Sequence, residues 1–195
     1  MLVARPVYAQ VDVRPFAMFA DEHFAASGTF DAIFQSDVAP FWGGGVDVVI
    51  HKHFFVDFAV SHMSRDGQRA FVNNGDVFRL QIPLHLESTP IEITGGYRFI
   101  FGRSRVIPYA GGGFGSYSFQ ETSGFDTAAE SVDVRHSGFV VTGGAEVRVT
   151  RWIGVTGDVQ YTHVPGILGS GGISKDLGEN DFGGVAGRIR VVIGR

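Results

Sequence analysis

A histidine and a serine two positions apart come closest to a nucleophilic pair in this sequence. His62 and Ser64 end a segment of alternating polarity, so in an extended strand they share one face. A serine hydroxyl becomes a nucleophile when a histidine takes its proton and a carboxylate orients that histidine. Asp66 or Asp76 could supply the carboxylate. The competing interpretation, which we favour, is a polar rim where a strand leaves apolar surroundings.

Two other short patterns resemble ligand sites but are incomplete. His51 and His53 flank Lys52 with no third ligand nearby, whereas a zinc site needs three or four. The run Gly169–Gly172 resembles a phosphate loop, but no Lys-Ser/Thr follows it. We therefore expect a solvated turn and a surface loop, with no catalytic residue, cofactor or metal ion.

The largest set of charged side chains lies on one face of the alternating segments. Five arginines and five acids balance there, as buried charges require. Arginine suits this position because it stays charged and binds carboxylates through two bonds. The sequence predicts an internal charge network of Arg14, Asp47, Asp57, Glu92, Arg98, Glu146, Arg148, Asp158, Arg188 and Arg190.

The elements that carry these charges are strands, because the dominant period is two. The opposite face of the alternation is apolar and free of charge after the first strand. Aspartate and arginine share a face with Phe16 and Met18 in that first strand, which suggests a bulge. A change of apolar parity across Glu87–Pro90 suggests a second irregularity. Eight strands are expected, near residues 11–22, 46–50, 54–61, 91–99, 105–119, 139–149, 153–162 and 185–193.

The connections between these strands alternate in length. Short turns fall near residues 51–53, 102–104 and 151–152, and long polar or glycine-rich segments near 24–40, 64–78, 120–135 and 164–181. Asn73-Asn74-Gly75-Asp76 is a hairpin turn signal, so the third and fourth strands should project as a hairpin. This asymmetry is typical of transmembrane barrels.

Composition narrows the class further. The chain has 195 residues, 18% charged and 13% aromatic, with no cysteine. Its mean hydropathy is +0.12. The net charge of −4 argues against a nucleic-acid partner, and no apolar run is long enough for a transmembrane helix. Val7-Tyr8-Ala9 resembles the end of a secretory signal, so residues 1–10 are a candidate signal-peptide remnant and residues 11–195 one domain.

These observations together predict an all-β fold, an eight-stranded antiparallel up-and-down transmembrane β-barrel. So narrow a barrel has an interior that side chains fill, so we expect a plugged lumen. The alternative is a soluble, lipocalin-like barrel with the apolar face inward. The membrane interpretation expects an aromatic girdle at the strand ends, consisting of Trp42, Tyr97, Phe99, Tyr109, Tyr117 and Tyr161.

Three segments carry a family resemblance: residues 89–99, with Gly95-Gly96-Tyr97-Arg98-Phe99, residues 107–115, with Pro108-Tyr109, and residues 141–148. They resemble the small outer-membrane β-barrel family, the OmpA/OmpX/OmpW-like porin-family barrels. The resemblance implies export through the periplasm, location in the bacterial outer membrane, and contact with the barrel-assembly machinery, lipid and lipopolysaccharide. Family members usually end in an aromatic residue, whereas this chain ends Ile193-Gly194-Arg195.

The expected role is structural or interactive and not enzymatic, with long extracellular loops. A closed barrel has no free strand edge, so a monomer is expected. Two alternatives stay open within the membrane class. One is an OmpW-like barrel that binds or passes a small hydrophobic molecule, with Phe16, Met18 and Phe114 in the lumen. The other follows from the likeness of His62 and Ser64 to the lipid-facing pair of lipid A deacylases.

Overall fold

The computed structural model describes residues 10–73, 76–102, 104–123, 132–169 and 171–194. The candidate signal remnant, except Gln10, lies outside this part of the chain. The regular elements are β1 (Val11–Phe24), α1 (Ser27–Phe34), β2 (Val38–Ile50), β3 (Phe54–Asn73), β4 (Asp76–Ser88), β5 (Ile91–Arg98), β6 (Val106–Ser123), β7 (Val132–Arg148), β8 (Ile153–His163), α2 (Gly172–Asp176) and β9 (Gly184–Ile193). None of the described helices has the length and apolarity needed to cross a membrane.

The strands form a closed antiparallel ring. Strands that are neighbours in sequence pair with each other, except β4 and β5, and β1 pairs with β9. The strands β4 and β5 share one position, because both lie between β3 and β6. The nine described strands therefore make a ring of eight positions, and the predicted eight-stranded up-and-down barrel is confirmed.

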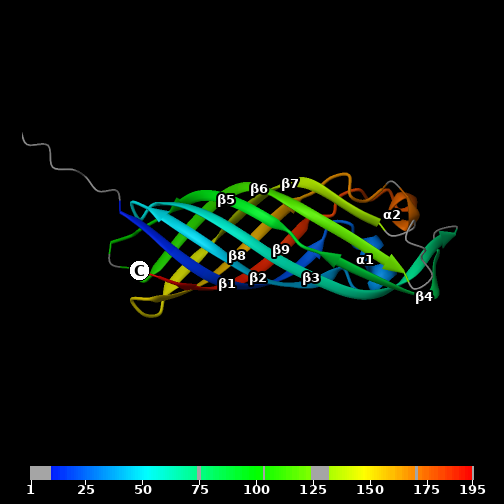
Figure 1. Ribbon diagram of the computed structural model, residues 1–195, viewed down its shortest axis with the longest axis horizontal. Helices are drawn as coiled ribbons and strands as arrows, with labels where there is room; N and C mark the ends of the chain where they lie inside the picture. The colour runs from blue at the N-terminus through cyan, green and yellow to red at the C-terminus, as the bar shows by residue number, and fades with distance from the viewer. Residues whose placement is uncertain (1–9, 74–75, 103, 124–131, 170, 195) are drawn as a thin grey trace, which may run out of the picture.

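The two ends of the barrel differ, as the connection lengths predict. Short connections such as the turn at His51–His53 close one end, which we call the turn end. At the other end, the loop end, lie α1, α2 and the β3/β4 hairpin, which extends beyond the neighbouring strands (Figure 1). The first and last described residues both lie at the turn end (Figure 1).

Neither predicted strand irregularity occurs where the sequence suggested. The first strand pairs with β2 without a shift from Val11 to His23, so Arg14, Phe16 and Met18 all face inward. Across Pro90 the register is also continuous, because Val60 pairs with Ile91 and Met63 with Ser88. The register shift falls in the projecting hairpin, between Gln68 and Ala70.

The change of apolar parity near Pro90 reflects a change in the kind of side chain that fills the barrel. Leu84, Leu86, Glu92 and Thr94 are all buried on the same inward face. The inward side chains are apolar toward the loop end and polar toward the turn end. The apolar residues therefore move from the inward positions of β4 to the outward positions of β5, while the backbone keeps the same alternation of inward and outward side chains.

Candidate functional site: the barrel interior and its loop end

The outer surface of the barrel is apolar around its circumference. Large apolar side chains that are exposed to solvent come from every strand position of the ring, among them Val13, Phe19, Val46, Phe58, Ile93, Phe114, Val141, Val159, Ile189 and Val191. We call this surface the apolar belt. Nine of the predicted charges lie inside, whereas Asp21 of β1 is exposed on the outward face. This arrangement is the reverse of the lipocalin-like alternative.

The predicted aromatic girdle is only partly on this surface. Trp42, Tyr97, Phe99 and Tyr161 are exposed, whereas the prediction was wrong for two tyrosines of β6. Tyr109 is 5% exposed and Tyr117 is 3% exposed, and both point into the lumen. Their hydroxyl groups need hydrogen-bond partners, and the interior carboxylates supply them.

Glycines make room for these inward aromatic rings. A Cβ on Gly115 would lie 2.7 Å from the Tyr117 hydroxyl oxygen. A Cβ on Gly111 would lie 2.8 Å from the ring of Phe55, which packs edge-on against Tyr109. The glycine run of β6 therefore accommodates large lumen side chains.

At the turn end of the lumen, Arg14 and Arg98 share one carboxylate. Arg14 donates from Nε to Asp47 Oδ2 at 3.0 Å and from Nη1 to Glu146 Oε1 at 3.1 Å. Arg98 Nη2 donates to Glu146 Oε2 at 2.6 Å. Arg148 was predicted to be internal, but it ends β7 at the rim, where 43% of its side chain is exposed and Nε lies 3.5 Å from Glu146.

In the middle of the lumen, Asp158 is the central acceptor. Its side chain is fully buried and accepts from Arg188 Nε at 2.6 Å and from the Tyr109 hydroxyl at 2.6 Å. Arg190 donates to Tyr109 at 2.7 Å and to Asp57 Oδ2 at 2.6 Å. The next layer belongs to Glu92, which accepts from other lumen side chains.

Glu92 closes the network on its loop side. It accepts from the Tyr117 hydroxyl at 2.7 Å and from Gln160 Nε2 at 3.0 Å, and Gln160 accepts in turn from Arg188. Sequence patterns missed Tyr109, Tyr117 and Gln160, since neutral polar residues carry no charge-balance signal. We call these buried residues and the nine buried predicted charges the lumen network.

Little free space lies between the side chains on the turn-end side of the lumen network. The space among Arg14, Asp47, Arg98 and Glu146 has a volume of about 10 Å³, roughly one water-sized probe. Four arginines of the lumen network face five carboxylates, and the surplus lies at Asp47 and Asp57, which oppose each other on β2 and β3. Their Oδ1 atoms are the two buried carboxylate oxygens without a hydrogen-bond partner in the described part of the lumen.

Apolar side chains fill the loop end of the interior. The buried Phe30 of α1 lies among them and stacks on Phe24 with ring centroids 3.8 Å apart. We call this cluster the loop-end core: Phe24, Phe30, Phe41, Met63, Leu84, Leu86, Tyr117, Phe119, Val140, Val164, Ile167 and Phe182, with three alanines, Ala20, Ala26 and Ala39. The described interior therefore carries a charged layer and, toward the loop end, a layer of hydrocarbon.

The helix α1 is held at both ends by residues from other loops. Glu179 accepts from the backbone N–H of Gly28 at 3.0 Å and of Thr29 at 2.7 Å, and from the Thr29 hydroxyl at 2.6 Å. Arg79 of the hairpin donates to the Ala32 carbonyl at 2.9 Å and to the Asp31 carbonyl at 3.0 Å. An acid at the N-terminus and a base at the C-terminus both favour the helix dipole.

The serine of the predicted nucleophilic pair meets a different histidine. His62 contacts Thr89 Oγ1 through Nδ1 at 3.2 Å, whereas Ser64 Oγ lies 3.4 Å from Nε2 of His85 on β4. The prediction of a His62–Ser64 pair is therefore wrong. The other predicted carboxylate, Asp76, begins β4 at the tip of the hairpin.

Carboxylates occupy both ring nitrogens of His85. Nδ1 lies 2.6 Å from Asp66 Oδ1, and Nε2 lies 3.2 Å from Glu87 Oε1. These hydrogen bonds, the one to Asp66 foremost, raise the pKa of His85 above its ordinary value. A ring nitrogen that donates to a carboxylate offers no lone pair for the proton of Ser64. With both ring nitrogens protonated, the cluster has the chemistry of an ion-paired rim.

Comparisons with known proteins identify the class of fold. No family model and no curated protein sequence matches the chain. Among solved structures, it resembles the N-terminal β-barrel domain of Pseudomonas aeruginosa OprF, with TM-score 0.55 and 11% identity over 96% of this chain and 100% of that one.

Two further structures have the same architecture. Ail, the attachment invasion locus protein of Yersinia pestis, matches with TM-score 0.55 and 10% identity over 95% of this chain and 97% of that one. OprG of P. aeruginosa, an outer-membrane protein, matches with TM-score 0.53 and 14% identity over 94% and 92%. The chain has the fold of the small outer-membrane β-barrels, as its resemblance to OmpA/OmpX/OmpW-like proteins implies.

Proposed function

We propose that this protein is a non-conducting, integral protein of a bacterial outer membrane, with a structural or interactive role carried by its loop end. The observation that supports this proposal is the filling of the described interior. The lumen space among Arg14, Asp47, Arg98 and Glu146 has a volume of about 10 Å³, and the loop-end core lies beyond the charges. A barrel filled in this way is expected to pass neither water nor ions.

The apolar belt supports the membrane location. A charged side chain facing lipid at the bilayer midplane costs about 2–4 kcal/mol in such barrels. The exposed apolar side chains of the belt meet this requirement, and the charges lie in the lumen. Export through the periplasm, insertion by the barrel-assembly machinery and a monomeric state belong to the same proposal.

The polar loop end is the part available for contacts outside the bilayer. Asp66, His85 and Glu87 lie on the outward face of the projecting hairpin. We propose that this end contacts lipopolysaccharide, surfaces or partner molecules. A non-enzymatic role agrees with the ion-paired state of His85.

Passage of a small hydrophobic molecule through the lumen is less well supported. Phe114, which that alternative places inside, is 76% exposed on the apolar belt. Phe16 and Met18 do face inward, where they pack with Ala59 and Val192. They line no open path.

Planar-bilayer recording tests the sealed interior. The protein is folded in detergent, and a band that shifts between cold and boiled SDS-PAGE identifies the inserted form. We expect no steady conductance above the lipid background. Open channels of uniform size in preparations with the shifted band would refute the proposal. Solubility of the native protein without detergent would refute the membrane location.

A further inference from the structure

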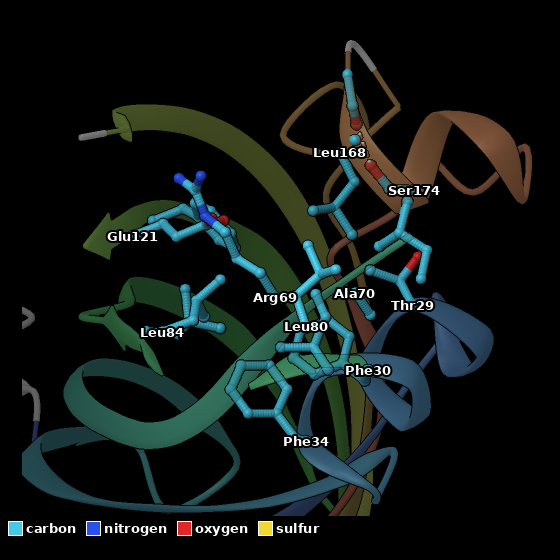
Figure 2. Close-up of a pocket in the computed structure, with 16 residues that line it drawn as sticks. Thr29, Phe30, Phe34, Arg69, Ala70, Leu80, Leu84, Glu121, Leu168 and Ser174 are labelled. Atoms are coloured by element: carbon cyan, nitrogen blue, oxygen red, sulfur yellow. Dashed lines mark hydrogen bonds between the residues drawn. The ribbon is translucent and has the colours of Figure 1, made fainter. Parts of the chain in front are cut away.

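A cavity of about 310 Å³ opens at the loop end. It lies between α1, the β3/β4 hairpin and the segment that leads into α2, with Phe30 and Phe34 on one wall and Leu168 and Ser174 on another (Figure 2). Ligand pockets commonly have volumes of about 300–1,000 Å³. The cavity is therefore large enough for a small molecule.

The lining of this cavity is mainly hydrocarbon. Apolar side chains come from both helices, from two strands and from a loop: Phe30, Ile33, Leu84, Phe119, Leu168 and Ile173. The hydroxyl groups on its wall bind the protein itself, because Thr29 donates to Glu179 and Ser174 to the Gly171 carbonyl. The charged side chains of Arg69 and Glu121 also line the cavity, and each interacts with other groups of the protein. The rest of the wall favours an uncharged apolar ligand.

The cavity walls are fixed, which keeps the cavity from collapsing. Glu179 and Arg79 hold the two ends of α1, and the ring of Phe34 lies against the backbone of β3 at Gly67, where an added Cβ would be 2.7 Å from it. A preformed pocket needs little ordering when a ligand enters, so less binding free energy is lost.

The inner wall of the cavity is closed. Phe30, Leu86 and Phe119 line it, and all three are buried members of the loop-end core. A ligand therefore enters and leaves at the loop end without crossing the barrel.

We propose that this cavity is a binding site for a small, uncharged apolar molecule, a hydrocarbon chain or an alkyl-substituted ring. A cavity of about 150 Å³ binds benzene, and this one is about twice as large. A molecule of the size of 1-phenylhexane fits that volume. The proposal goes beyond the sealed barrel, because it adds capture at the loop end without transport.

Methyl NMR of the full chain in phosphatidylcholine nanodiscs, titrated with 1-phenylhexane, tests the proposal. Ile33 and Ile173 report on the cavity, whereas Ile189 and Ile193 face the lipid. We expect saturable shifts at the first pair and only small, linear shifts at the second. Equal linear shifts at all four residues would show partition into lipid alone and overturn the proposal.

Two alanine substitutions provide a matched pair. Ala70→Phe fills the cavity from its wall, whereas Ala110→Phe adds the same ring to the exposed face of β6. We expect affinity to fall about ten-fold or more in A70F, since overfilling a packed site is costly, and to stay unchanged in A110F. If A70F lacks the cold/boiled band shift, Leu168→Trp fills the cavity from the loop. Native affinity in a folded filling variant would overturn the proposal.

Discussion

Replacement of Asp158 by asparagine removes the negative charge and one of the two acceptor oxygens at the centre of the lumen network while keeping the shape of the side chain. Asp158 accepts from Arg188 at 2.6 Å, from Tyr109 at 2.6 Å and from Thr142 at 3.2 Å. The variant leaves a buried guanidinium against a neutral amide. Breaking one partner of a buried ion pair costs about 3–5 kcal/mol. Because Arg188 keeps its bond to Gln160, we expect about 3 kcal/mol.

Asp57→Asn is the control within the same lumen. Asp57 accepts one hydrogen bond, from Arg190, and its Oδ1 has no partner among the described residues. It also opposes Asp47 across the β2–β3 pairing, so neutralising it removes a repulsion between like charges. An asparagine amide can in addition donate to Asp47. We therefore expect a change in stability within about 1 kcal/mol of zero.

Equilibrium unfolding in guanidinium chloride measures both variants. The protein is held in detergent micelles, and the fraction folded is read from the cold SDS-PAGE band. The reasoning requires a clear fall in unfolding free energy for D158N and little change for D57N. Equal losses of unfolding free energy in the two variants, or no loss in D158N, would refute the reasoning. That reasoning holds that a carboxylate stabilises the fold according to the number of hydrogen bonds it accepts.

Three further outcomes are expected. Glu179→Gln should weaken the N-terminal anchor of α1 by about 1–3 kcal/mol, seen as faster hydrogen exchange over residues 27–34 while β-strand amides stay protected. The His85 imidazole should titrate above 6.5 in NMR. Because the pKa of His85 is raised in the folded protein, its pairing with Asp66 and Glu87 stabilises the hairpin at low pH, and this stabilisation is lost as pH rises through the folded-state pKa. Asp66→Asn should lower this midpoint, and an unchanged midpoint would contradict the pairing. Gly111→Val should block folding, because its Cβ would lie 2.7 Å from the Gly95 carbonyl oxygen and 2.8 Å from the Phe55 ring; because the first clash is with backbone, Phe55→Ala in the same chain should not restore the SDS-PAGE band shift.

The barrel and most of its internal charges follow from the sequence because lipid and water impose opposite demands on alternate residues. Asp158 and Arg188 occupy one face of alternating strands whose other face carries no charge. Burial of such groups without a partner is costly, so their near balance already indicated pairing. The particular partners depend on the ring register, which local patterns do not contain.

The orientation of the tyrosines was harder to predict, because a phenol side chain is suited both to the lumen and to the membrane-facing surface of the barrel. Tyr109 and Tyr117 follow the inward positions of β6, yet an apolar ring with a polar tip also fits a membrane interface. The better signal was the nearby glycine. Gly111 and Gly115 provide space for large rings in the lumen.

Spacing in the sequence could not predict that Ser64, Asp66, His85 and Glu87 lie together on the β3/β4 hairpin. Ser64 pairs with Glu87 and Asp66 pairs with His85 across the β3/β4 hairpin. This register brings a histidine from 21 residues away to the serine, whereas His62, two residues away, turns to Thr89. The register of β3 and β4 therefore determines which histidine contacts Ser64, and the His62-x-Ser64 spacing does not.

The anchor of α1 also constrains the order in which the molecule can be completed. Glu179, which fixes the start of this helix, lies 150 residues after Thr29 in the chain. Its loop directly precedes β9, so the helix gains this anchor only after the chain from β1 to β8 has been made. The cap over the barrel is therefore completed after most of the barrel strands, and the three segments that share it cannot be exchanged one at a time between related proteins without rebuilding the contacts between them.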